Sequence, residues 1–482
     1  MGTPLLSVTD VRAIEHSTQL KLPAGTLMAR AGAAIAARIG AFQHGEPLSI
    51  CVVAGPGNNG GDGYVAAREL RDAGHRVTCV QPARPAADDA RNALANWKAS
   101  GGVTHSDLPA ESHFDIVVDA ILGIGQTRPL QGTLLAAAQW INAQRARVIA
   151  VDVPSGLEAD RGCWIGGVEG VHASETITFI ADKPGLHTAD GTDAAGHVSV
   201  DALGTQSTAT RTTLTDPADF SQISAPRRRN THKGSYGSAL IIGGNAGMVG
   251  AALLAARAAL RIGAGRVYVD CIGAPELRFD PMQPELMFKP AASIDNPQCI
   301  VIGCGLGTDD AARRALQWAL DSDAPLVIDA DALNLLARGP ALAECLTARS
   351  APTVLTPHPL EAARMLDVPV GDIQLDRVAS AREIAVRHRS IVVLKGAGSI
   401  VADTHGRCAI NPTGSPALAT AGTGDVLAGL IGGLLSQAFE IRQATLAAVW
   451  LHGRAGESDA GLVAGDVALR AAEQLSELRR SS

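Results

Sequence analysis

The sequence predicts an α/β protein made of two doubly wound domains, and three observations support that prediction. A chain of 482 residues is too long for a single hydrophobic core. Strand and helix signals alternate along both halves, which is the pattern of parallel sheets covered by helices. Each half also contains a short apolar strand that runs into a glycine-rich turn. With 52 glycines and only 3% aromatic residues, the helices are expected to pack closely against their sheets.

Charge and composition exclude several classes of protein. A formal net charge of -7 and a pI near 6.0 give no electrostatic footprint for nucleic acid. No apolar run reaches the roughly 20 residues that span a bilayer, and residues 1–10 lack a basic region followed by an apolar one. We therefore expect a cytoplasmic protein without a membrane segment. The eight cysteines include no Cys-x-x-Cys pair, which indicates neither a zinc site nor a disulfide framework.

The first half contains the arrangement that binds dinucleotides in doubly wound sheets. Residues 26–42 place apolar side chains four apart, which predicts an amphipathic helix. Residues 48–54 are expected to form an apolar strand, residues 55–63 a glycine-rich loop and residues 64–73 a helix. Further strands are expected at residues 77–80, 115–122, 148–153 and 176–180.

The glycine-rich loop also carries polar side chains. Asn58, Asn59 and Asp62 lie among five glycines, so the loop supplies both oxygen ligands and amide donors. That mixture suits a bound cation beside a phosphate or a ribose. The alternative is a purely structural turn, which would not require these side chains.

Two later strand ends carry polar residues as well. Asp119 closes one strand, and Asp152 and Ser155 follow in the next. Ligands of open α/β sheets bind beyond the carboxyl ends of the strands, so these residues should converge with the glycine-rich loop. The alternative for Asp152 is a strand-end cap.

A polar stretch at residues 205–226 separates the halves and is interpreted as a linker. The basic run at residues 227–229 follows it. We interpret this run as a solvated edge of the linker, the alternative being a patch that binds a partner. Domains are therefore predicted at residues 1–215 and 226–482, each able to fold alone and to keep its own reaction.

The second half repeats the alternation of strands and helices. A strand at residues 238–243 ends in glycines and precedes an alanine-rich helix at residues 249–263. The βα period then continues, which predicts a second parallel sheet with helices on both faces. Its remaining strands are expected at residues 267–271, 299–303, 325–330, 353–356 and 391–395.

The segment Gly422, Thr423, Gly424 and Asp425 carries the strongest chemical signal in this half. Small residues here let a backbone approach a ligand, and the apolar run at residues 426–438 predicts a helix that begins near Asp425. The free N–H groups and the positive dipole end of such a helix favour a phosphate, with Asp425 beside it as a base. The alternative is a tight turn in which Asp425 is only an N-cap.

This segment resembles the ADP/ATP-dependent NAD(P)H-hydrate dehydratases, a branch of the ribokinase-like kinases. Four further segments agree in order, namely HKGSYG at residues 232–237, DADALN at 329–334, TPHP at 356–359 and KGAGS at 395–399. The first half separately resembles the NAD(P)H-hydrate epimerases, which carry the same NNGGDG segment. The resemblance covers nearly the whole chain. It implies a Rossmann-like α/β/α sandwich followed by a ribokinase-like α/β domain.

For the first domain, the resemblance implies a potassium ion held by Asn59, Asp119 and Ser155. Asp152 would face the nicotinamide-derived ring as a catalytic general acid and base. The substrate-binding residues would be Asn58, Asn59, Gly60, Gly61, Asp62, Gly123, Ile124, Gly125, Gln126, Thr127, Arg128, Pro129 and Asp152.

For the second domain, the resemblance implies ADP as co-substrate, with ATP as the second choice, magnesium with the polyphosphate, and Asp425 as the catalytic base. ADP would be held by Lys395, Gly396, Ala397, Gly398, Ser399, Gly422, Thr423 and Gly424. His358 lies between two prolines, and a rigid turn of this kind favours a ligand contact over a place in the core. The hydrated nucleotide would contact Ala251, Gly305, Gly307, His358 and Asp425.

Two positions depart from the family pattern. Leu360 stands where glycine is usual after the His-Pro pair. Cys304 stands where proline is usual in the glycine-rich turn at residues 303–307. Both substitutions alter loop stiffness, and neither removes a side-chain contact that the resemblance implies.

The resemblance implies a homo-oligomeric repair enzyme for hydrated NADH and NADPH (NADHX and NADPHX). The first domain would interconvert the R and S epimers. The second would use ADP to dehydrate the S epimer, releasing AMP and phosphate. Two alternatives stay open. One is a kinase of a small alcohol, in which Asp425 activates a hydroxyl and the phosphate is retained, and the other is a nucleotide-sensing binding module.

Overall fold

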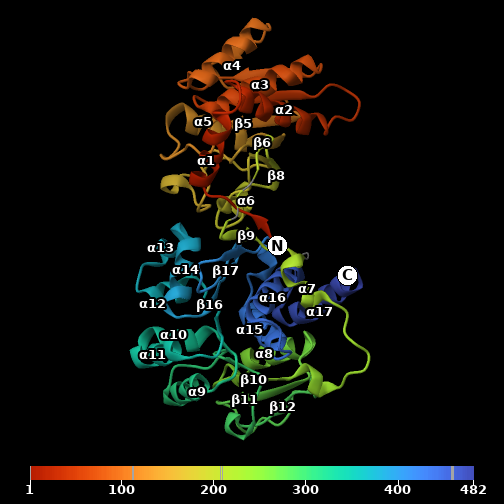
Figure 1. The fold of residues 1–482 in the computed structure, drawn as a ribbon, viewed down its shortest axis with the longest axis vertical. Coiled ribbons are helices and arrows are strands. Elements are labelled where there is room, and N and C mark those ends of the chain that lie inside the picture. The colour runs from red at the N-terminus through yellow and green to blue at the C-terminus, as the bar shows by residue number, and fades with distance from the viewer. Residues whose placement is uncertain (1, 111–112, 207, 209, 458–460, 482) are drawn as a thin grey trace. The chain divides into compact units, whose positions relative to one another are not determined.

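The computed structural model describes the whole chain apart from residues 1, 111–112, 207, 209, 458–460 and 482. The described chain divides into two compact units, which Figure 1 colours along the sequence. The first unit is Pro4–Thr210. The second unit is Arg211–Ser482 together with the residues that precede Pro4, so the chain contributes to the second unit both before and after the first.

A seven-stranded sheet forms the centre of the first unit. Its strand order is β4-β3-β2-β5-β6-β7-β8, and all neighbouring strands are parallel. The chain order reverses between β2 and β5, because the chain winds outward through β3 and β4 before it returns to β5. The strands are Ser49–Ala54 (β2), Arg76–Val80 (β3), Thr104–His105 (β4), Ile116–Ala120 (β5), Arg147–Val151 (β6), Glu175–Phe179 (β7) and His197–Asp201 (β8).

Helices cover both faces of this sheet. In β2, Ile50 and Val52 belong to the apolar cluster under α2 and α3, whereas Cys51 and Val53 belong to the cluster under α5. A strand that alternates between two apolar clusters is buried on both faces, which confirms the predicted α/β/α sandwich. The helices are Val8–Gln19 (α1), Thr26–Gly40 (α2), Asn58–Asp72 (α3), Asp88–Ala99 (α4), Gly132–Asn142 (α5) and Gly191–Ala194 (α6).

Residues 58–63 of the glycine-rich loop predicted at residues 55–63 instead form the first turns of α3. A Cβ on Gly60 would lie 2.0 Å from the Gly55 carbonyl oxygen, and one on Gly61 would lie 2.4 Å from Met28 Cε. The glycines therefore let the helix start pack tightly against the strand end and against α2. This close packing outweighs their poor helix propensity, which is why the sequence-based prediction was wrong.

An eleven-stranded sheet forms the centre of the second unit. Its order is β1-β9-β18-β17-β16-β15-β14-β13-β10-β11-β12, and the chain order reverses between β10 and β13. Strands β10 to β16 pair in parallel, as predicted. The strands are Thr3–Pro4 (β1), Thr212–Leu214 (β9), Ser238–Gly243 (β10), Arg266–Cys271 (β11), Met287–Phe288 (β12), Cys299–Ile302 (β13), Leu326–Ile328 (β14), Thr353–Leu355 (β15), Ile391–Leu394 (β16), Ile400–Ala402 (β17) and Cys408–Ile410 (β18).

The second sheet is not wholly parallel, which corrects the prediction. β17 pairs antiparallel with both β16 and β18. Residues 395–399 and 403–407 join these strands, and connections of this length are too short for the crossover that a parallel pair needs.

Four helices cover one face of the second sheet. The buried side chains of α8, α15, α16 and α17 form one apolar cluster with residues of β10, β11 and β13. The helices are Ser221–Ser224 (α7), Val249–Arg261 (α8), Asp310–Leu320 (α9), Ala330–Arg338 (α10), Pro340–Ala348 (α11), Pro359–Leu366 (α12), Val370–Leu375 (α13), Arg377–Arg387 (α14), Thr423–Leu435 (α15), Ile441–Gly456 (α16) and Ala464–Ser481 (α17). Within the described residues, none of the helices combines the length and the apolar character needed to cross a membrane.

Helix α15 begins at Thr423, two residues before its predicted start. Gly422 is its N-cap and has a left-handed backbone (φ 91°), a conformation that glycine adopts without strain. Asp425 is therefore the third residue of the helix. This position excludes the alternative in which Asp425 is an N-cap.

The segment predicted as a linker, residues 205–226, forms structure where it is described. β9 pairs with β18 at the sheet edge, and Pro217–Phe220 and Ser221–Ser224 form short helices. Phe220 and Ile223 are fully buried in the core of the second unit. Elements of three or four residues are too short to show periodicity, so the sequence did not reveal them. Two residues of the predicted linker, 207 and 209, lie outside the described residues.

Candidate active sites

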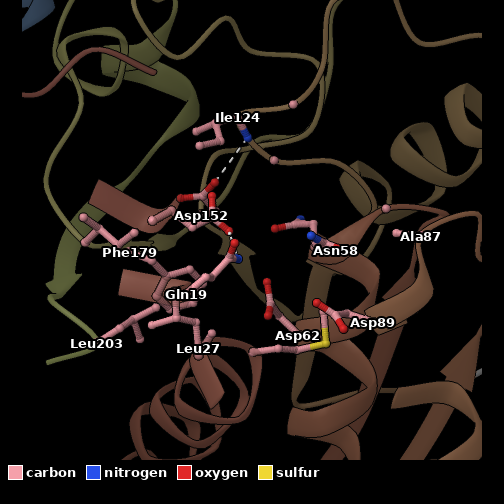
Figure 2. A pocket seen from close by; sticks show the side chains of 18 of the residues that line it. Gln19, Leu27, Asn58, Asp62, Ala87, Asp89, Ile124, Asp152, Phe179 and Leu203 are labelled. Atoms are coloured by element: carbon pink, nitrogen blue, oxygen red, sulfur yellow. Dashed lines mark hydrogen bonds between the residues drawn. The ribbon is translucent and has the colours of Figure 1, made fainter. Parts of the chain in front are cut away.

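A cavity of about 730 Å³ opens in the first unit beside the switch between β2 and β5 (Figure 2). Doubly wound sheets bind ligands at such a point because the loops diverge there. The walls come from α1, α2, the start of α3 and the loops after β5, β6 and β7. Eight of the predicted residues line it: Asn58, Asn59, Asp62, Gly123, Ile124, Gly125, Gln126 and Asp152.

Asp152 lies directly after β6 with a left-handed backbone (φ 67°), which is uncommon for a residue other than glycine. Its Oδ1 accepts a hydrogen bond from Lys183 Nζ at 2.7 Å. Its Oδ2 accepts one from the Ile124 N–H at 3.2 Å. Both partners lie outside β6, so the side chain of Asp152 does not cap the end of its own strand, which was the alternative role. The carboxylate is instead held from two sides.

Lys183 is fully buried, and the sequence analysis did not single it out. Its ammonium group also donates to Thr178 Oγ1 at 2.5 Å and to the Phe179 carbonyl oxygen at 3.0 Å. Three acceptors thus match the three protons of the ammonium group, which offsets the cost of burying its charge. Lys183 does not line the cavity, so it acts there through Asp152.

Three more carboxyl groups line the cavity, Asp62 from α3, Glu15 from α1 and Asp89 from α4. Burial holds the pKa of Asp62 well above its usual range, and the charges of Asp152 and Glu15 raise it further. Burial and then the charge of Asp152 raise the pKa of Glu15, while Arg12 and Lys183 lower it. The cavity therefore combines one ion-paired carboxylate with carboxyl groups that keep their protons to higher pH.

Asp119 is the fourth residue of β5 and Ser155 lies in the loop after β6, and neither lines the described cavity wall. Asp119 accepts hydrogen bonds from Ser155 Oγ at 2.7 Å and from the Ser155 N–H at 2.8 Å. Burial raises the pKa of Asp119 to about 6, although these bonds lower it. Asn59 Nδ2 is buried and has no partner among the described residues. A buried carboxylate and an unsatisfied amide, which can turn its oxygen toward a ligand, fit a bound cation.

The remaining predicted residues of this site do not line the cavity. Gln126 holds their loop in place, because its Oε1 accepts from the Gly156 N–H at 2.8 Å and its Nε2 donates to the Arg128 carbonyl oxygen at 2.9 Å. The Arg128 side chain is exposed. The predicted residues outside the cavity wall are Gly60, Gly61, Thr127, Arg128 and Pro129.

In the second unit, three strand ends bring Asp329, Thr356 and Lys395 together. Lys395 Nζ donates to Asp329 Oδ1 at 2.7 Å, and Thr356 Oγ1 donates to the same oxygen at 2.8 Å. Burial lowers the pKa of Lys395, but the charges of Asp329 and Glu361 raise it by more. A charged lysine therefore stands at the carboxyl ends of β14 to β16.

Asp425 faces this ion pair from the first turn of α15. Burial raises the pKa of Asp425 to about 6, and the charge of Asp329 adds to the rise. A Cβ on the neighbouring Gly424 would lie 3.4 Å from Lys395 Nζ and 3.9 Å from Asp329 Oδ2. A carboxyl group with a pKa near neutrality, beside a helix N-terminus and a lysine, is suited to act as a general base on an anionic ligand.

Cys304 also belongs to this cluster. Its sulfur and the carboxylates of Asp329 and Asp425 lie within 4.8 Å of one another. Burial, together with the charge of Asp425, holds the pKa of the Cys304 thiol well above its usual range. The residue that departs from the family pattern is therefore a neutral thiol that hydrogen-bonds the predicted base.

The glycine-rich turn after β13 lies against the start of α8. A Cβ on Gly305 would lie 3.0 Å from Ala251 Cβ, so these two predicted residues are neighbours. The Gly307 N–H donates to Asp331 Oδ2 at 2.8 Å. The DADALN motif therefore holds two different parts of the site, because its first aspartate binds Lys395 and its second binds the glycine turn.

The predicted nucleotide loop at residues 395–399 is supported by a buried arginine. Arg377 is 2% exposed and donates to the Lys395 carbonyl oxygen at 3.2 Å. A Cβ on Gly396 would lie 2.9 Å from the Arg377 guanidinium, and Gly396 has a φ of 135°. Ser399 Oγ donates to the Gly396 carbonyl oxygen at 3.0 Å. Glycine is therefore required there for a close approach to protein, whatever ligand the loop binds.

His358 is the N-cap of α12. Its Nδ1 accepts from the N–H groups of Leu360 at 3.1 Å and Glu361 at 3.3 Å, and Glu361 Oε2 accepts from the His358 N–H at 2.8 Å. This is a capping box. Burial and the charge of Lys395 lower the pKa of His358. The ring is half-exposed, so it lies outside the core and is accessible to a ligand.

The sequence matches the profiles of two families. Residues 239–473 match the family described as NAD(P)H-hydrate dehydratase, and residues 24–185 match the one described as YjeF-related protein N-terminus. The bifunctional NAD(P)H-hydrate repair enzyme Nnr of Coxiella burnetii is 35% identical over 470 residues, covering 92% of this chain and 93% of that protein. Its Escherichia coli counterpart is 36% identical over 463 residues, covering 93% and 88%. The chain belongs to the bifunctional NAD(P)H-hydrate repair enzymes.

A solved structure confirms the fold of the second half of this repair enzyme. A ribokinase-like superfamily protein from Enterococcus faecalis aligns with a TM-score of 0.50 at 24% identity, covering 57% of this chain and 98% of that one. The second unit therefore has the ribokinase-like fold that the sequence predicts.

Sequence reasoning missed three buried charged residues of the repair enzyme. Asp329 opens a motif at a strand end, and its position opposite Lys395, another strand end, was a usable signal. Lys183 and Arg377 belong to no motif. Their roles follow from hydrogen bonds to Asp152 and to the Lys395 loop, which only the three-dimensional structure reveals.

Proposed function

We propose that this repair enzyme restores hydrated NADH and NADPH in two steps. The first unit interconverts the R and S epimers, and the second dehydrates the S epimer with ADP, releasing AMP and phosphate. The observation that carries the proposal is shared by the two sites. Each places a lysine-bound carboxylate beside a second carboxyl group of raised pKa, at the carboxyl ends of the parallel strands of its sheet. The relatives that match over the whole chain support the same two activities.

In the first unit, the hydrated nicotinamide ring binds in the cavity beside Asp152. The 6-hydroxyl of the hydrate belongs to a hemiaminal, so the ring nitrogen can expel it once it is protonated and readmit it on either face. The negative charge of Asp152 stabilises the cationic ring that forms between these steps. Asn58, Asn59 and the loop that begins at Gly123 hold the nucleotide, with Gly125 and Gln126 in the cavity wall.

In the second unit, Asp425 accepts the proton of the substrate hydroxyl as that oxygen attacks the terminal phosphorus of ADP. The bond from phosphorus to AMP breaks in the same step. The free N–H groups at the start of α15 and the Lys395 ammonium stabilise the charge on the transferring phosphoryl group. Phosphate then leaves C6 as the ring nitrogen supplies its electron pair, and loss of the C5 proton restores the dihydronicotinamide. Ala251, Gly305, Gly307 and His358 are the proposed contacts to the hydrate.

Two metal ions belong to the proposal. Potassium would be held by Asn59, Asp119 and Ser155, where an all-oxygen donor set meets a buried carboxylate that lacks a basic partner among the described residues. Its charge would compensate the Asp119 carboxylate and order the loop above it. Magnesium would accompany the polyphosphate near the hard carboxylate oxygens of Asp329 and Asp425, where it neutralises charge on phosphate.

One incubation tests the function. The protein is mixed with ADP and hydrated NADH, and the near-ultraviolet absorbance of reduced nicotinamide is followed together with released phosphate. Recovery of absorbance with an equal amount of phosphate supports repair. A stable phosphorylated product without recovered absorbance supports the kinase of a small alcohol. Bound nucleotide without any turnover of hydrate supports the binding module.

The proposal includes a cytoplasmic homo-oligomer. All eight cysteines are free thiols, as expected in a reducing compartment. Light scattering coupled to size exclusion measures the oligomeric state directly, and a mass equal to that of one chain would contradict this part of the proposal.

A further inference from the structure

Resting on the proposed epimerase function of the first unit, we propose that Asp62 and Asp152 form a two-carboxyl acid–base pair that works from two sides of the cavity, with Lys183 as the residue that positions Asp152. Figure 2 places the two carboxyl groups on different walls, Asp62 on the helix α3 and Asp152 on the loop after β6, and both side chains reach toward the space between them. An epimerisation moves a hydroxyl from one face of a ring to the other, so it requires proton transfer on both faces.

The contacts of Lys183 hold Asp152 as the ionised member of the pair. The ammonium group contacts Asp152 Oδ1 from the side away from the cavity, because Lys183 is fully buried and absent from the cavity wall. The second oxygen, Oδ2, accepts from the Ile124 N–H and lies near Gly123, both of which line the cavity. Asp152 therefore presents one oxygen to the ligand while a cation neutralises the other.

Asp62 has the opposite surroundings. It lies in the second turn of α3, and none of the described side chains or backbone N–H groups donates a hydrogen bond to its carboxyl group. The charges that face it are those of Asp152 and Glu15, which are both negative, and burial acts in the same direction. A carboxyl group in this environment keeps its proton and can donate it. Two neighbouring carboxyl groups with opposed environments are the arrangement that assigns an acid and a base.

The proton balance of the step is closed. Asp62 gives its proton to the 6-hydroxyl oxygen on its face, the C6–O bond breaks with its electron pair on oxygen, and the ring nitrogen forms a double bond to C6. Water then attacks C6 from the opposite face and loses a proton to Asp152. The product is the other epimer, Asp62 is ionised and Asp152 is protonated. The reverse reaction starts from that state, and exchange with solvent resets the pair.

The test uses the full chain without ADP, so that the second unit cannot dehydrate the hydrate. Exchange between the separated R and S epimers is followed by liquid chromatography. Asp62→Asn is expected to slow epimerisation roughly 100-fold, since a positioned general acid or base contributes about that much. The matched control is Asp72→Asn, an exposed aspartate on the same helix, which is expected to leave the rate unchanged. Thermal unfolding of each full-chain variant, followed through the transition of the first unit, reports that this unit is folded.

Two further variants separate the proposal from its competitors. Glu15→Gln removes the carboxyl group that faces Asp62 together with Asp152, and it is expected to slow epimerisation at least tenfold less than Asp62→Asn does. Lys183→Met is expected to lower the rate and to move the acid limb of its pH profile to higher pH, because Asp152 loses its cation. A loss in Glu15→Gln that equals the loss in Asp62→Asn, or an unshifted pH profile in Lys183→Met, would overturn the proposal.

The native chain supplies a measurement that needs no variant. If Asp62 must be protonated and Asp152 ionised, the epimerisation rate falls at both low and high pH, and heavy oxygen from labelled water enters C6 once per turnover. A rate that stays constant as pH rises, or retention of the original oxygen, would sink the two-carboxyl pair. A native chain that does not epimerise at all would instead refute the proposed function on which this inference rests.

Discussion

Both sites lie at the carboxyl ends of parallel strands, beside a helix whose first turns contain glycines, yet the glycines serve different purposes in the two sites. At the start of α3, Gly60 and Gly61 are covered by protein, so an added Cβ would collide with a backbone carbonyl or with Met28. At the start of α15, Gly424 faces the Asp329–Lys395 pair with room for a Cβ at 3.4 Å. A glycine-rich segment therefore does not say by itself whether its glycines serve packing or a ligand.

The lysines of the two sites, Lys183 and Lys395, also differ in how far they are available to a ligand. Lys183 is fully buried and donates all three of its ammonium protons in hydrogen bonds to protein oxygens. The Lys395 side chain is 19% exposed and is bound to Asp329. The first lysine can serve only the carboxylate beside it, whereas the second can also reach a phosphate. This difference matches a proton-transfer site in one unit and a phosphoryl-transfer site in the other.

The largest expected effect separates the two reactions. Asp425→Asn keeps the size of the side chain and removes the base, so dehydration of the S epimer should fall roughly 100-fold or more, while ADP affinity changes little. Epimerisation should be unchanged. Steady-state rates and ADP titration measure both quantities, and Asp310→Asn, in the first turn of α9, is the matched control. Near-normal turnover per folded molecule would move the search for the base to His358.

Exchanging single glycines tests the contrast directly. Gly60→Ala places a Cβ 2.0 Å from the Gly55 carbonyl oxygen, so we expect the first unit to lose about 1–3 kcal/mol of unfolding free energy and most of its epimerase activity. Gly424→Ala should leave thermal unfolding unchanged and weaken ADP binding. Calorimetry and ADP titration distinguish the two cases. An equal loss of stability in both variants would show that the glycines of the two sites do not differ in their role.

The pH dependence of dehydration should report Asp425. Its pKa of about 6 in the folded chain means that the rate rises with pH and levels off above about pH 6, as the base becomes ionised. The unfolded carboxyl group titrates near the model-peptide value of 3.8. Between these values the folded state binds more protons, so this group lowers the unfolding free energy as pH rises. A dehydration rate that does not change between pH 5 and pH 7 would contradict the assignment.

A smaller effect is expected at Cys304. Its thiol donates to Asp425 and lowers the pKa of that carboxyl group, so Cys304→Ala should move the acid limb of the dehydration profile slightly to higher pH. The rate at neutral pH should change less than about threefold, because most of the carboxyl groups stay ionised above the midpoint. Unfolding in denaturant should reveal a cost of about 1 kcal/mol for the lost sulfur. A shift to lower pH would disprove the hydrogen bond.

The smallest effect should come from separating the units. We propose that residues 4–210 and 211–482 each fold and keep their own reaction within about twofold, since each has its own core. The boundary matters, because a piece starting at residue 226 lacks Phe220, Ile223 and β9. Thermal unfolding of both C-terminal pieces compares the two boundaries, and equal stability would show that residues 211–225 contribute nothing.

The long buried strands and the order of motifs were predictable because their signals are local. β10 spans the predicted residues 238–243, and β2, β13 and β16 differ from their predicted bounds by one residue. The position of Gly424 beside Lys395 was also foreseen, because the family resemblance implies that both hold ADP. What failed depended on close packing and on the lengths of connections, which local composition does not show. The helical start of α3 is decided by packing on Gly55, and the antiparallel β17 by the shortness of its connections.

The sequence motifs predicted which segments form the site, but not which of their residues face the cavity. Asn59, Asp62 and Asp152 do line one cavity, whereas Thr127, Arg128 and Pro129 belong to the same loop without facing it. A motif specifies which residues a loop contains, but the hydrogen bonds of Gln126 decide which of them point inward. No sequence pattern marks a fully buried lysine such as Lys183, because its bond to Asp152 joins residues that lie 31 positions apart.

The split of the second unit around the first has a consequence for biosynthesis. The Gly2 N–H donates to Asp219 Oδ1 at 2.6 Å, across a separation of 217 residues. Thr3 belongs to the second unit, and the whole of the first unit follows before the chain returns at Arg211. On the ribosome, the first unit can finish folding as soon as it emerges. Gly2 and Thr3 are made before the first unit, yet they must stay unpaired until β9 and Asp219 have been translated. The epimerase half therefore matures ahead of the dehydratase half, and the nascent chain carries an unpaired edge segment while the whole first unit is being made.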